Sequence, residues 1–440
     1  MAVEGSLEAP TRHPLAWRDA SFYDETALTQ ELARVFDICH GCRRCFSLCN
    51  AFPTLFDAVD GSSTGEVDGV DRKVFWQVVN HCYLCDMCFM TKCPYVPPHP
   101  WNVDFPHLML RAKAVRAKKE KLPLRDRVLA ATEAVGNFAG IPIVVHVVNA
   151  VNRSKSGRAL LEKTLGVHRE APVPRFEAKT FRRRFAASAT AVVQSTPQTR
   201  GRVALFVTCY GNRNEPQLDE DLLAVLRHNG IAVQLTERER CCGMPRLELG
   251  DLQSVAHLKE INVPQLLRAI EAGCDIVAPI PSCVLMFKQE LPLMFPEDAD
   301  VQRVRRHVFD PFEYLMLRHK AGLLRTDFKT TLGKVSYHVP CHLRVQNIGL
   351  KTRDVLQLIP GTTVETTERC SGHNGTYAVK REFRSASMRI GRPVVQRVES
   401  AQPDYYSSDC PMAGHQIESG LKEVRPPTHP LTLLRLAYGI

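Results

Sequence analysis

The 440-residue sequence contains no run of 18 or more apolar residues, the length that a membrane-spanning helix requires. The nearest stretch, residues 138–151 (FAGIPIVVHVVNAV), is too short and is interrupted by Pro142 and His146. The first residues show no basic segment followed by an apolar one, so we expect no secretory signal and a cytoplasmic location. Thiols stay reduced in the cytoplasm, and the 16 cysteines are therefore not expected to form disulfides.

Other absences limit the chemistry that the chain carries by itself. Neither a G-x-G-x-x-G fingerprint nor a Walker A sequence occurs, so the sequence gives no sign of a flavin or nucleotide site. Residues 106–200 contain no cysteine, whereas residues 1–105 and 201–440 contain eight each. The net charge of +10 is modest for this length and does not by itself indicate nucleic-acid binding.

The positive charge is concentrated in one segment. Residues 111–184 contain 18 Lys or Arg and 6 Asp or Glu, a net charge of +12, so the remainder of the chain carries −2. The segment begins with a predicted basic helix and ends with FRRRF at residues 181–185. Two interpretations stay open: a solvated helical connector, or a surface that binds anionic lipid or an acidic partner. Nucleic acid is not an expected partner, because no interleaved aromatic residues accompany the charge.

The C-terminal half alternates predicted strands and helices. Apolar, β-branched runs predict strands at residues 203–208, 231–235, 275–280 and 335–339. Helical patterns follow at residues 218–230, 252–273 and 380–400. This alternation predicts an α/β fold with a largely parallel sheet.

Two tightly spaced cysteine runs lie in the first 105 residues. Residues 39–49 read C-x2-C-x2-C-x3-C, and residues 82–94 read C-x2-C-x2-C-x4-C-P. This is close to the doubled spacing of bacterial ferredoxins, in which three cysteines at i, i+3 and i+6 bind one 4Fe–4S cluster and a more distant cysteine completes it. The second run has one extra residue before its last cysteine, and Asn50 stands where a proline is expected after the first. Zinc is the alternative, but it favours paired cysteines separated by a longer loop.

In two-cluster ferredoxins the fourth cysteine of each run ligates the other cluster. The expected ligands of the first cluster are therefore Cys39, Cys42, Cys45 and Cys93. Those of the second cluster are Cys82, Cys85, Cys88 and Cys49. The 32 residues between the runs include a helical stretch at residues 71–79, so we predict a helical dicluster unit.

A second cysteine pattern occurs twice in the C-terminal half. The first copy has a cysteine after a strand, an adjacent pair followed by glycine, and a cysteine in a later loop: Cys209, Cys241, Cys242 and Cys283. The second copy has serine in place of one paired cysteine: Cys341, Cys370, Ser371 and Cys410. Intervals of 32 and 41 residues in the first copy recur as 29 and 39 in the second. A duplication with a period near 130 residues, and hence two related α/β domains, explains these intervals.

The position of these cysteines indicates a metal cluster. Ligands of open α/β sheets bind at the carboxyl ends of strands, where most of these cysteines lie. The adjacent pair Cys241 and Cys242 suggests that one thiolate bridges two irons. Buried core thiols are the alternative interpretation, and we expect Cys274, which has no counterpart in the second copy, to be one of them.

The two cysteine runs, CCG at residues 241–243, HVPCHLR at 338–344 and CSGHNGTY at 370–377 resemble the CCG-domain iron–sulfur oxidoreductases. This family includes heterodisulfide reductase subunits, the subunit designated C of anaerobic glycerol-3-phosphate dehydrogenase, and iron–sulfur oxidoreductases associated with rubrerythrin. The resemblance covers the chain from about residue 30 to about residue 420. It implies that CCG units bind a 4Fe–4S centre, which is non-cubane in heterodisulfide reductase.

Carried over to this sequence, the resemblance implies one complete cluster site at Cys209, Cys241, Cys242 and Cys283. It implies a second, incomplete site at Cys341, Cys370 and Cys410, because the hydroxyl of Ser371 is a poor iron ligand beside a thiolate. A histidine can replace cysteine on iron, so three residues are candidates to complete the second site: His342, His373 and His415.

We therefore predict an α+β multidomain fold, in which a helical dicluster ferredoxin-like domain precedes two duplicated α/β CCG domains. The expected divisions are the dicluster domain at residues 1–105, a basic helical connector at 106–200, and CCG domains at 201–330 and 331–440.

The expected function is electron transfer, as an iron–sulfur oxidoreductase subunit. Its partner would be a flavoprotein dehydrogenase or a rubrerythrin-like protein, and its acceptor a quinone or another oxidant. The protein would then lie in the cytoplasm or peripherally on the inner face of the plasma membrane. The alternative is a thiol–disulfide reductase of the heterodisulfide type, with Cys241 and Cys242 as candidate catalytic residues. A third possibility, a zinc-dependent structural or nucleic-acid module, fits the cysteine spacing poorly.

Overall fold

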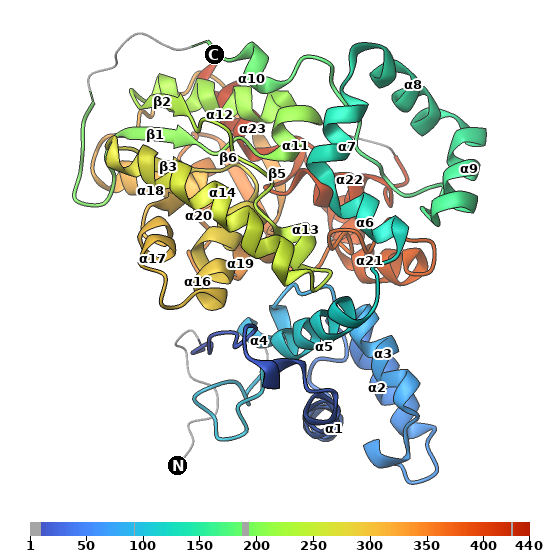
Figure 1. Cartoon of the computed structure of the whole chain (residues 1–440). Helices are drawn as coiled ribbons and strands as arrows, with labels where there is room; N and C mark the ends of the chain where they lie inside the picture. Colours follow the sequence, from blue (N-terminus) through green and yellow to red (C-terminus); the bar gives the residue numbers. More distant parts are fainter. Residues whose placement is uncertain (1–9, 92, 187–192, 424–425) are drawn as a thin grey trace.

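A computed structural model describes residues 10–91, 93–186, 193–423 and 426–440. Helices and two parallel sheets make up the molecule, with a helical N-terminal unit below a larger α/β body (Figure 1). Within its described residues, the N-terminal unit has five α-helices: α1 (Glu25–Cys42), α2 (Ala51–Asp60), α3 (Arg72–His81), α4 (Met87–Thr91) and α5 (Phe105–Lys119). Two short 3-10 turns accompany them, Ala20–Tyr23 and Val67–Gly69.

Helix α1 shows how the sequence fixes the elements that carry the first cysteines. The Asp24 carboxylate caps it by accepting a hydrogen bond from the Ala27 N–H at 2.9 Å. The helix ends at Arg43, whose φ of 51° is left-handed. Its buried face is Leu28, Leu32, Val35 and Phe36, spaced three or four residues apart, and the Phe36 ring meets Phe75 of α3 edge-on.

Helix α5, in which the basic segment starts, is mostly buried up to Val115, so this part is not a solvated connector; Lys118 and Lys119 at its end are exposed. It packs its apolar residues into the N-terminal core, and even Lys113 is only 8% exposed. The Lys113 ammonium donates to the carbonyl oxygens of Cys82 and Glu248, so it joins the N-terminal unit to the body above. Burial lowers the pKa of Lys113 to about 8. The number of cations along this part of the sequence therefore did not predict which of them are exposed to solvent.

The chain then forms a lobe at one side of the body (Figure 1). Its helices are α6 (Leu124–Ala130), α7 (Thr132–Ala139), α8 (Pro142–Arg153) and α9 (Lys155–Leu165), followed by the short α10 (Phe181–Arg184). Among the described residues no single helix is long and apolar enough to cross a membrane. The pair α7 and α8 meets the length and composition criteria only when taken together, and it is bent by 107°.

The first sheet has four parallel strands in the order β2-β1-β3-β4. These strands are β1 (Arg202–Leu205), β2 (Ala232–Leu235), β3 (Asp275–Val277) and β4 (Val308–Phe309). The helices of this half are α11 (Cys209–Arg213), α12 (Pro216–His228), α13 (Met244–Leu247), α14 (Leu252–Glu271), α15 (Pro281–Leu285), α16 (Leu291–Met294), α17 (Ala299–Arg305) and α18 (Pro311–Lys320), with a π-helical turn at Met286–Glu290. Strand β2 lies on one side of β1 and strand β3 on the other. The strand order therefore reverses at β1, and the crevice between the carboxyl ends of β1 and β3 is a topological switch point.

The second sheet repeats this arrangement. Its parallel order is β6-β5-β7, from β5 (Gly333–His338), β6 (Thr362–Thr367) and β7 (Tyr405–Ser408). The helices of this half are α19 (Cys341–Arg344), α20 (Lys351–Leu356), α21 (Arg384–Ala401), α22 (Pro411–Glu418) and α23 (Pro430–Tyr438). In both sheets the first strand lies between the second and the third, which is the topology that a duplication produces.

The four strands predicted from apolar runs are present as β1, β2, β3 and β5, with ends that differ by up to three residues. Three further strands were not predicted. Strand β6 reads TTVETT and alternates exposed with buried residues at the edge of its sheet, β7 reads YYSS, and β4 has two residues. None of the three carries the continuous apolar run on which the prediction relied.

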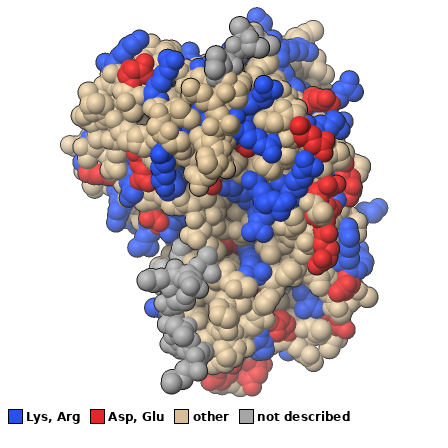
Figure 2. All heavy atoms as spheres, turned by 90° about the vertical axis from the view of Figure 1, so that its left-hand side faces the viewer, with Lys and Arg blue, Asp and Glu red and all other residues tan. Residues whose placement is uncertain are grey.

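The side of the body opposite the lobe α6–α9 carries charges of both signs. On the face shown in Figure 2, Lys and Arg side chains are spread over the upper part, and Asp and Glu lie beside them along the right-hand edge.

The C-terminal helix α23 closes the body by packing on α12, where the Arg435 guanidinium pairs with the buried Asp221 carboxylate at 2.7 Å.

Candidate iron–sulfur sites

The first group of thiols, site A, lines a cavity in the N-terminal unit. Cys39 and Cys42 lie in the last turn of α1, Cys45 lies in the turn after it, and Cys93 comes from the second cysteine run. Burial raises the pKa of Cys39 well above its usual range, and three neighbouring thiols add to the rise: Cys93, Cys45 and Cys42. The cavity of about 310 Å³, measured to its open mouth, is otherwise lined mainly by apolar side chains, among them Ile38, Phe52, Phe56 and Val103.

Site B collects the other four cysteines of the two runs: Cys49, Cys82, Cys85 and Cys88. Burial raises the pKa of Cys88 well above its usual range, and thiols of both runs contribute further: Cys45, Cys85, Cys82 and Cys49. Cys49 therefore lies with the second run, just as Cys93 lies with the first. The fold places the last cysteine of each run beside the other run.

Site C lies at the switch point of the first sheet. Cys209 follows β1 at the start of α11, Cys283 is in α15 after β3, and the pair Cys241 and Cys242 ends the loop after β2. Hydrogen bonds from Cys209 and Cys242 lower the pKa of Cys241 well below its usual range. Cys242 also contacts Cys283, so the four thiols form one connected group.

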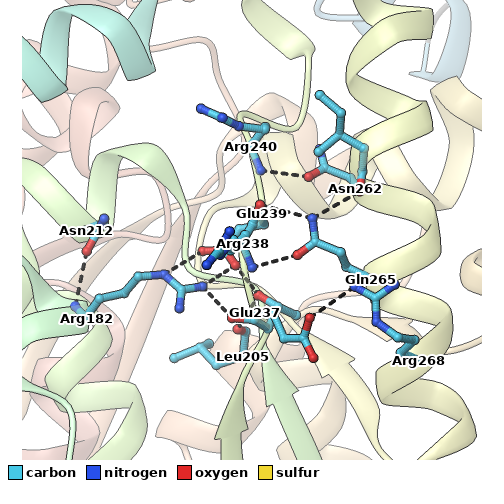
Figure 3. Close-up of polar contacts among 12 residues, drawn as sticks. Arg182, Leu205, Asn212, Glu237, Arg238, Glu239, Arg240, Asn262, Gln265 and Arg268 are labelled. Atoms are coloured by element: carbon cyan, nitrogen blue, oxygen red, sulfur yellow. Dashed lines mark hydrogen bonds and ion pairs between the residues drawn. The ribbon is translucent and has the colours of Figure 1, made fainter.

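The loop that carries the cysteine pair is fixed by side chains from two other elements (Figure 3). Arg182 of α10 donates a hydrogen bond to the Thr236 carbonyl. It also donates to the Glu239 carboxylate, with 3.1 Å between Arg182 Nε and Glu239 Oε1. From α14, the Asn262 amide donates to the Cys241 carbonyl at 3.1 Å, and Gln265 bonds the backbone of Arg238 at both its N–H and its carbonyl. The loop before the pair has no regular secondary structure of its own, and side chains from α10 and α14 hold its shape.

Site D occupies the matching place in the second sheet. Cys341 follows β5, Cys370 ends the loop after β6, and Cys410 follows β7. Burial raises the pKa of Cys341, and Cys370 and then Cys410 add to the rise. The Cys370 sulfur also accepts a hydrogen bond from the Gly372 N–H at 3.3 Å and lies 3.6 Å from the Tyr83 hydroxyl of the N-terminal unit.

The glycine of each motif is required by the backbone. Gly243 has a φ of +104° and Gly372 a φ of +79°, a region that residues with a Cβ rarely adopt. A Cβ on Gly372 would also lie 2.1 Å from the Ser387 carbonyl oxygen. These glycines turn the chain directly after the cysteine pair and after its Cys-Ser equivalent.

The three histidines proposed to complete site D differ in their hydrogen bonds. The His342 ring bonds the Ser282 hydroxyl at 2.8 Å and is further fixed by the Leu84 backbone. The His415 ring lies between Glu215 at 2.8 Å and Glu418 at 2.9 Å. Both ring nitrogens of His373 are buried and, within the described ranges, lack a hydrogen-bond partner. Of the three histidines, His373 is thus the one whose ring nitrogens are not already engaged in hydrogen bonds within the described ranges.

The four sites form a series. Site A adjoins site B through Cys45 and Cys88. Burial raises the pKa of Cys85 in site B, and Cys341 and Cys370 of site D are the next contributors. Beside site C, burial raises the pKa of Tyr210, with Glu215 and then Cys410 of site D adding to the rise. The order through the molecule is A, B, D, C, so site D lies between the N-terminal sites and site C.

The donor set fits iron–sulfur clusters better than single ions. All 16 cysteines are free thiols, and 15 of them belong to the four sites. Over the part of the chain that the structure describes, no three His, Cys, Asp or Glu side chains converge closely enough to hold one metal ion. Zinc requires four donors around a single point, whereas a cluster needs thiols arranged around a cavity, as in site A. The remaining thiol, Cys274, is fully buried before β3.

Two segments, residues 203–288 and 335–418, match the CCG cysteine-rich domain. The first contains site C and the second contains site D, so the chain carries this domain twice. The duplication predicted from cysteine spacing is confirmed.

The chain is also similar over long stretches to subunits of oxidoreductases. It is 29% identical over 342 residues to the subunit designated C of the anaerobic glycerol-3-phosphate dehydrogenase of Escherichia coli strain K12, covering 77% of this chain and 83% of that relative. It is 28% identical over 236 residues to the subunit designated B of the CoM/CoB fumarate reductase of Methanothermobacter marburgensis, covering 52% and 45%. An uncharacterised iron–sulfur protein of Methanocaldococcus jannaschii is 25% identical over 226 residues, covering 51% and 42%. The chain is homologous to these proteins, which confirms the predicted relationship.

Sequence reasoning missed the residues that position the sites. Arg182 belongs to FRRRF, which was interpreted only as part of a charged segment, yet it holds the loop before Cys241. Lys113 was counted in the same segment, yet it is buried against the Cys82 carbonyl. No sequence signal separates these cations from their solvated neighbours, because their partners are 54 and 31 residues away along the chain.

Proposed function

We propose that this protein is an electron-transfer subunit of an oxidoreductase complex. Sites A and B of a ferredoxin-like unit, residues 1–105, each hold a 4Fe–4S cluster, and site C holds a third 4Fe–4S centre. Residues 106–200 join this unit to two repeated domains, residues 201–330 and 331–440. The observation that carries the proposal is the continuous series of thiol groups A, B, D and C, because electrons pass readily only between closely spaced centres.

The residues around the thiols have distinct tasks in this proposal. The thiolates hold the iron, and the apolar side chains around site A limit the access of water. Bound clusters supply one-electron transfer at potentials that hydrogen bonds and solvent exposure adjust. At site D, His373 supplies the fourth donor that Ser371 cannot, and the Gly372 N–H fixes the Cys370 sulfur.

The donor and the acceptor are separate molecules in this proposal. The sequence has no flavin or nucleotide motif, and two of the relatives are named as subunits of larger enzymes, so electrons come from a partner. The partner is a flavoprotein dehydrogenase or a rubrerythrin-like protein, and the acceptor is a quinone or another oxidant. The protein works in the cytoplasm, at the inner face of the plasma membrane.

Thiol–disulfide reduction at site C is the second candidate function. The lowered pKa of Cys241 favours it, because a thiolate is the attacking species. The exposure of the pair disfavours it, since Cys241 is 8% and Cys242 5% exposed, which leaves little room for a disulfide to approach. Reduction of a disulfide by the isolated, chemically reduced protein would favour this second function over electron transfer.

Anaerobic purification followed by metal analysis and EPR tests the proposal. Iron and acid-labile sulfide near ~12 or more atoms each per chain are expected from three or four clusters. Cys242→Ala should remove one EPR signal and leave the signals of sites A and B unchanged. A colourless protein that contains zinc would overturn the proposal, and unchanged spectra in Cys242→Ala would overturn the ligand assignment at site C. Co-purification of the native complex identifies the donor.

A further inference from the structure

The lobe α6–α9 has an unusually apolar surface. Twelve large apolar side chains are exposed in the described ranges, and seven of them lie on or between these four helices: Leu124, Phe138, Ile141, Ile143, Val147, Val151 and Leu160. Several project fully, since Ile143 is 80%, Phe138 63% and Leu160 60% exposed. Isolated exposed apolar residues are ordinary, but a concentration of them marks an interaction surface.

The exposed large apolar residues of α8 share one side of the helix. Ile143, Val147 and Val151 are spaced four residues apart, whereas Val145 and Asn149 face the protein and are buried. The 107° bend between α7 and α8 leaves Phe138 and Ile141 at the corner where the two helices meet. The lobe projects from the body, so nothing in the described chain covers this face (Figure 1). A bent amphipathic pair of this kind suits a position in the plane of a membrane surface.

In the described part of the chain, the charges on the same helices that lack an ion pair are all positive. Each acidic residue is paired: Asp126 with Lys380, Glu133 with Arg240, and Glu162 with Arg169. Four exposed cations have no ion pair within the described ranges: Arg127, Arg153, Lys155 and Lys163. The surface that is free to interact is therefore apolar and positive.

We infer that the apolar face of α6–α9 docks into an anionic membrane surface, with its Ile, Val, Leu and Phe side chains at the boundary of the acyl chains and its unpaired cations on lipid phosphates. A protein partner fits this face less well. The centres of protein interfaces are depleted in charge and rich in aromatic residues, whereas this face has one aromatic ring and four unpaired cations.

Docking by this lobe would place site C near the membrane. Helix α7 packs against α11, which begins at Cys209, and its Asn137 accepts a hydrogen bond from Arg213 of α11. The lobe is thus attached to the elements that carry site C. An acceptor dissolved in lipid would meet the last site of the series A, B, D, C; this consequence rests on the proposed function, whereas the docking rests on exposure and charge.

Vesicle flotation of the anaerobically purified full chain tests the inference. The protein is mixed with vesicles of phosphatidylcholine alone or with phosphatidylglycerol added, at low and high salt. We expect flotation only with the anionic vesicles, weakened by salt. The double variant Ile143→Ser/Val147→Ser should lower the bound fraction at least about tenfold. Leu436→Ser, an exposed apolar residue of α23, is the matched control and should not change binding.

A second measurement locates the face. Phe138→Trp should gain fluorescence quenching by brominated anionic lipid, and Leu436→Trp should not. Absence of flotation at low salt, or a double variant that floats like the parent, would overturn the inference. Loss of a partner protein from the native complex in the double variant, with vesicle binding unchanged, would assign the face to a protein. Cluster EPR and reduction of a soluble dye by the double variant should be unaltered, so failure of docking is separable from failure of the electron-transfer proposal.

Discussion

At the residue scale, the positions of two cysteines, the last of each run, decide how the two runs are used. Cys93 lines the cavity of site A with three cysteines of the first run, and Cys49 lies with the second run. A cavity shared between distant segments makes each run depend on the other. Loss of either fourth cysteine should therefore affect the cluster of the opposite run.

Cys93→Ala tests this exchange. We expect loss of about one to four irons per chain and a changed EPR signal from one N-terminal cluster, because the cavity of site A loses one of its four thiols. Cys274→Ala is the matched control, since Cys274 is a fully buried thiol outside the four sites. Equal iron content in both variants would contradict the assignment of Cys93 to site A.

His373→Ala tests the completion of site D. Its ring nitrogens are buried and have no partner in the described ranges, so we expect this variant to lose or alter the site D signal in EPR and Mössbauer spectra. His342→Ala should keep the signal, because the His342 ring is already bonded to Ser282. His373→Cys should restore it with a lower reduction potential, since replacing imidazole by thiolate on iron lowers the potential. A site D signal that survives in His373→Ala excludes this histidine as a ligand.

At the element scale, the loop before Cys241 is held by its neighbours rather than by its own secondary structure. Arg182 reaches it from α10, and Asn262 and Gln265 reach it from α14 (Figure 3). The Glu239 carboxylate that Arg182 meets is 5% exposed, so this ion pair is far better shielded than the pair of Arg268 with Glu237 on the same loop. The first pair should matter for the site and the second should not.

Arg182→Gln should destabilise the protein by about 2 kcal/mol, because it leaves the buried Glu239 charge without its cation. Site C should also lose iron faster to a chelator, as followed by the decay of its EPR signal. Arg268→Gln, which breaks the exposed pair, is the control and should cost less than about 1 kcal/mol. Thermal unfolding provides the stability measurement. Identical chelation rates for the two variants would show that Arg182 does not hold the loop.

At the scale of the whole molecule, the two CCG domains are joined by charged contacts across their boundary. His415 of α22 bonds Glu215, the residue that precedes α12 of the first domain. The hydrogen bond to Glu215 raises the pKa of His415 to about 9, against the effect of burial. Protonated His415 therefore holds the two domains together.

This contact predicts a pH dependence. The folded-state pKa of about 9 lies above the unfolded value of about 6.5, so protonation favours the folded state. The contribution should be complete below about pH 6.5 and should disappear between about pH 6.5 and 9. Because the side chain is 38% exposed, we expect about 1 kcal/mol at most after solvent screening. His415→Gln should flatten the change in the urea midpoint over this window, whereas His257→Gln, on the exposed side of α14, should retain it. A dependence that persists in His415→Gln must arise elsewhere.

The sequence by itself determined the local features. Cysteine spacing predicted a duplicated α/β domain, and the motifs around the cysteines indicated the CCG domain. Apolar runs predicted β1, β2, β3 and β5, because buried parallel strands need continuous apolar residues. Polar edge strands such as β6 escaped prediction for the same reason.

Only the tertiary structure decided which charges are free and in which order the thiols lie. Lys113 and Arg182 are structural cations, whereas the unpaired cations that the structure describes on α6–α9 accompany an exposed apolar face. Site D comes last along the sequence, yet the fold places it between sites B and C. Burial and proximity arise from contacts between residues far apart in the chain, and spacing along the sequence does not encode them.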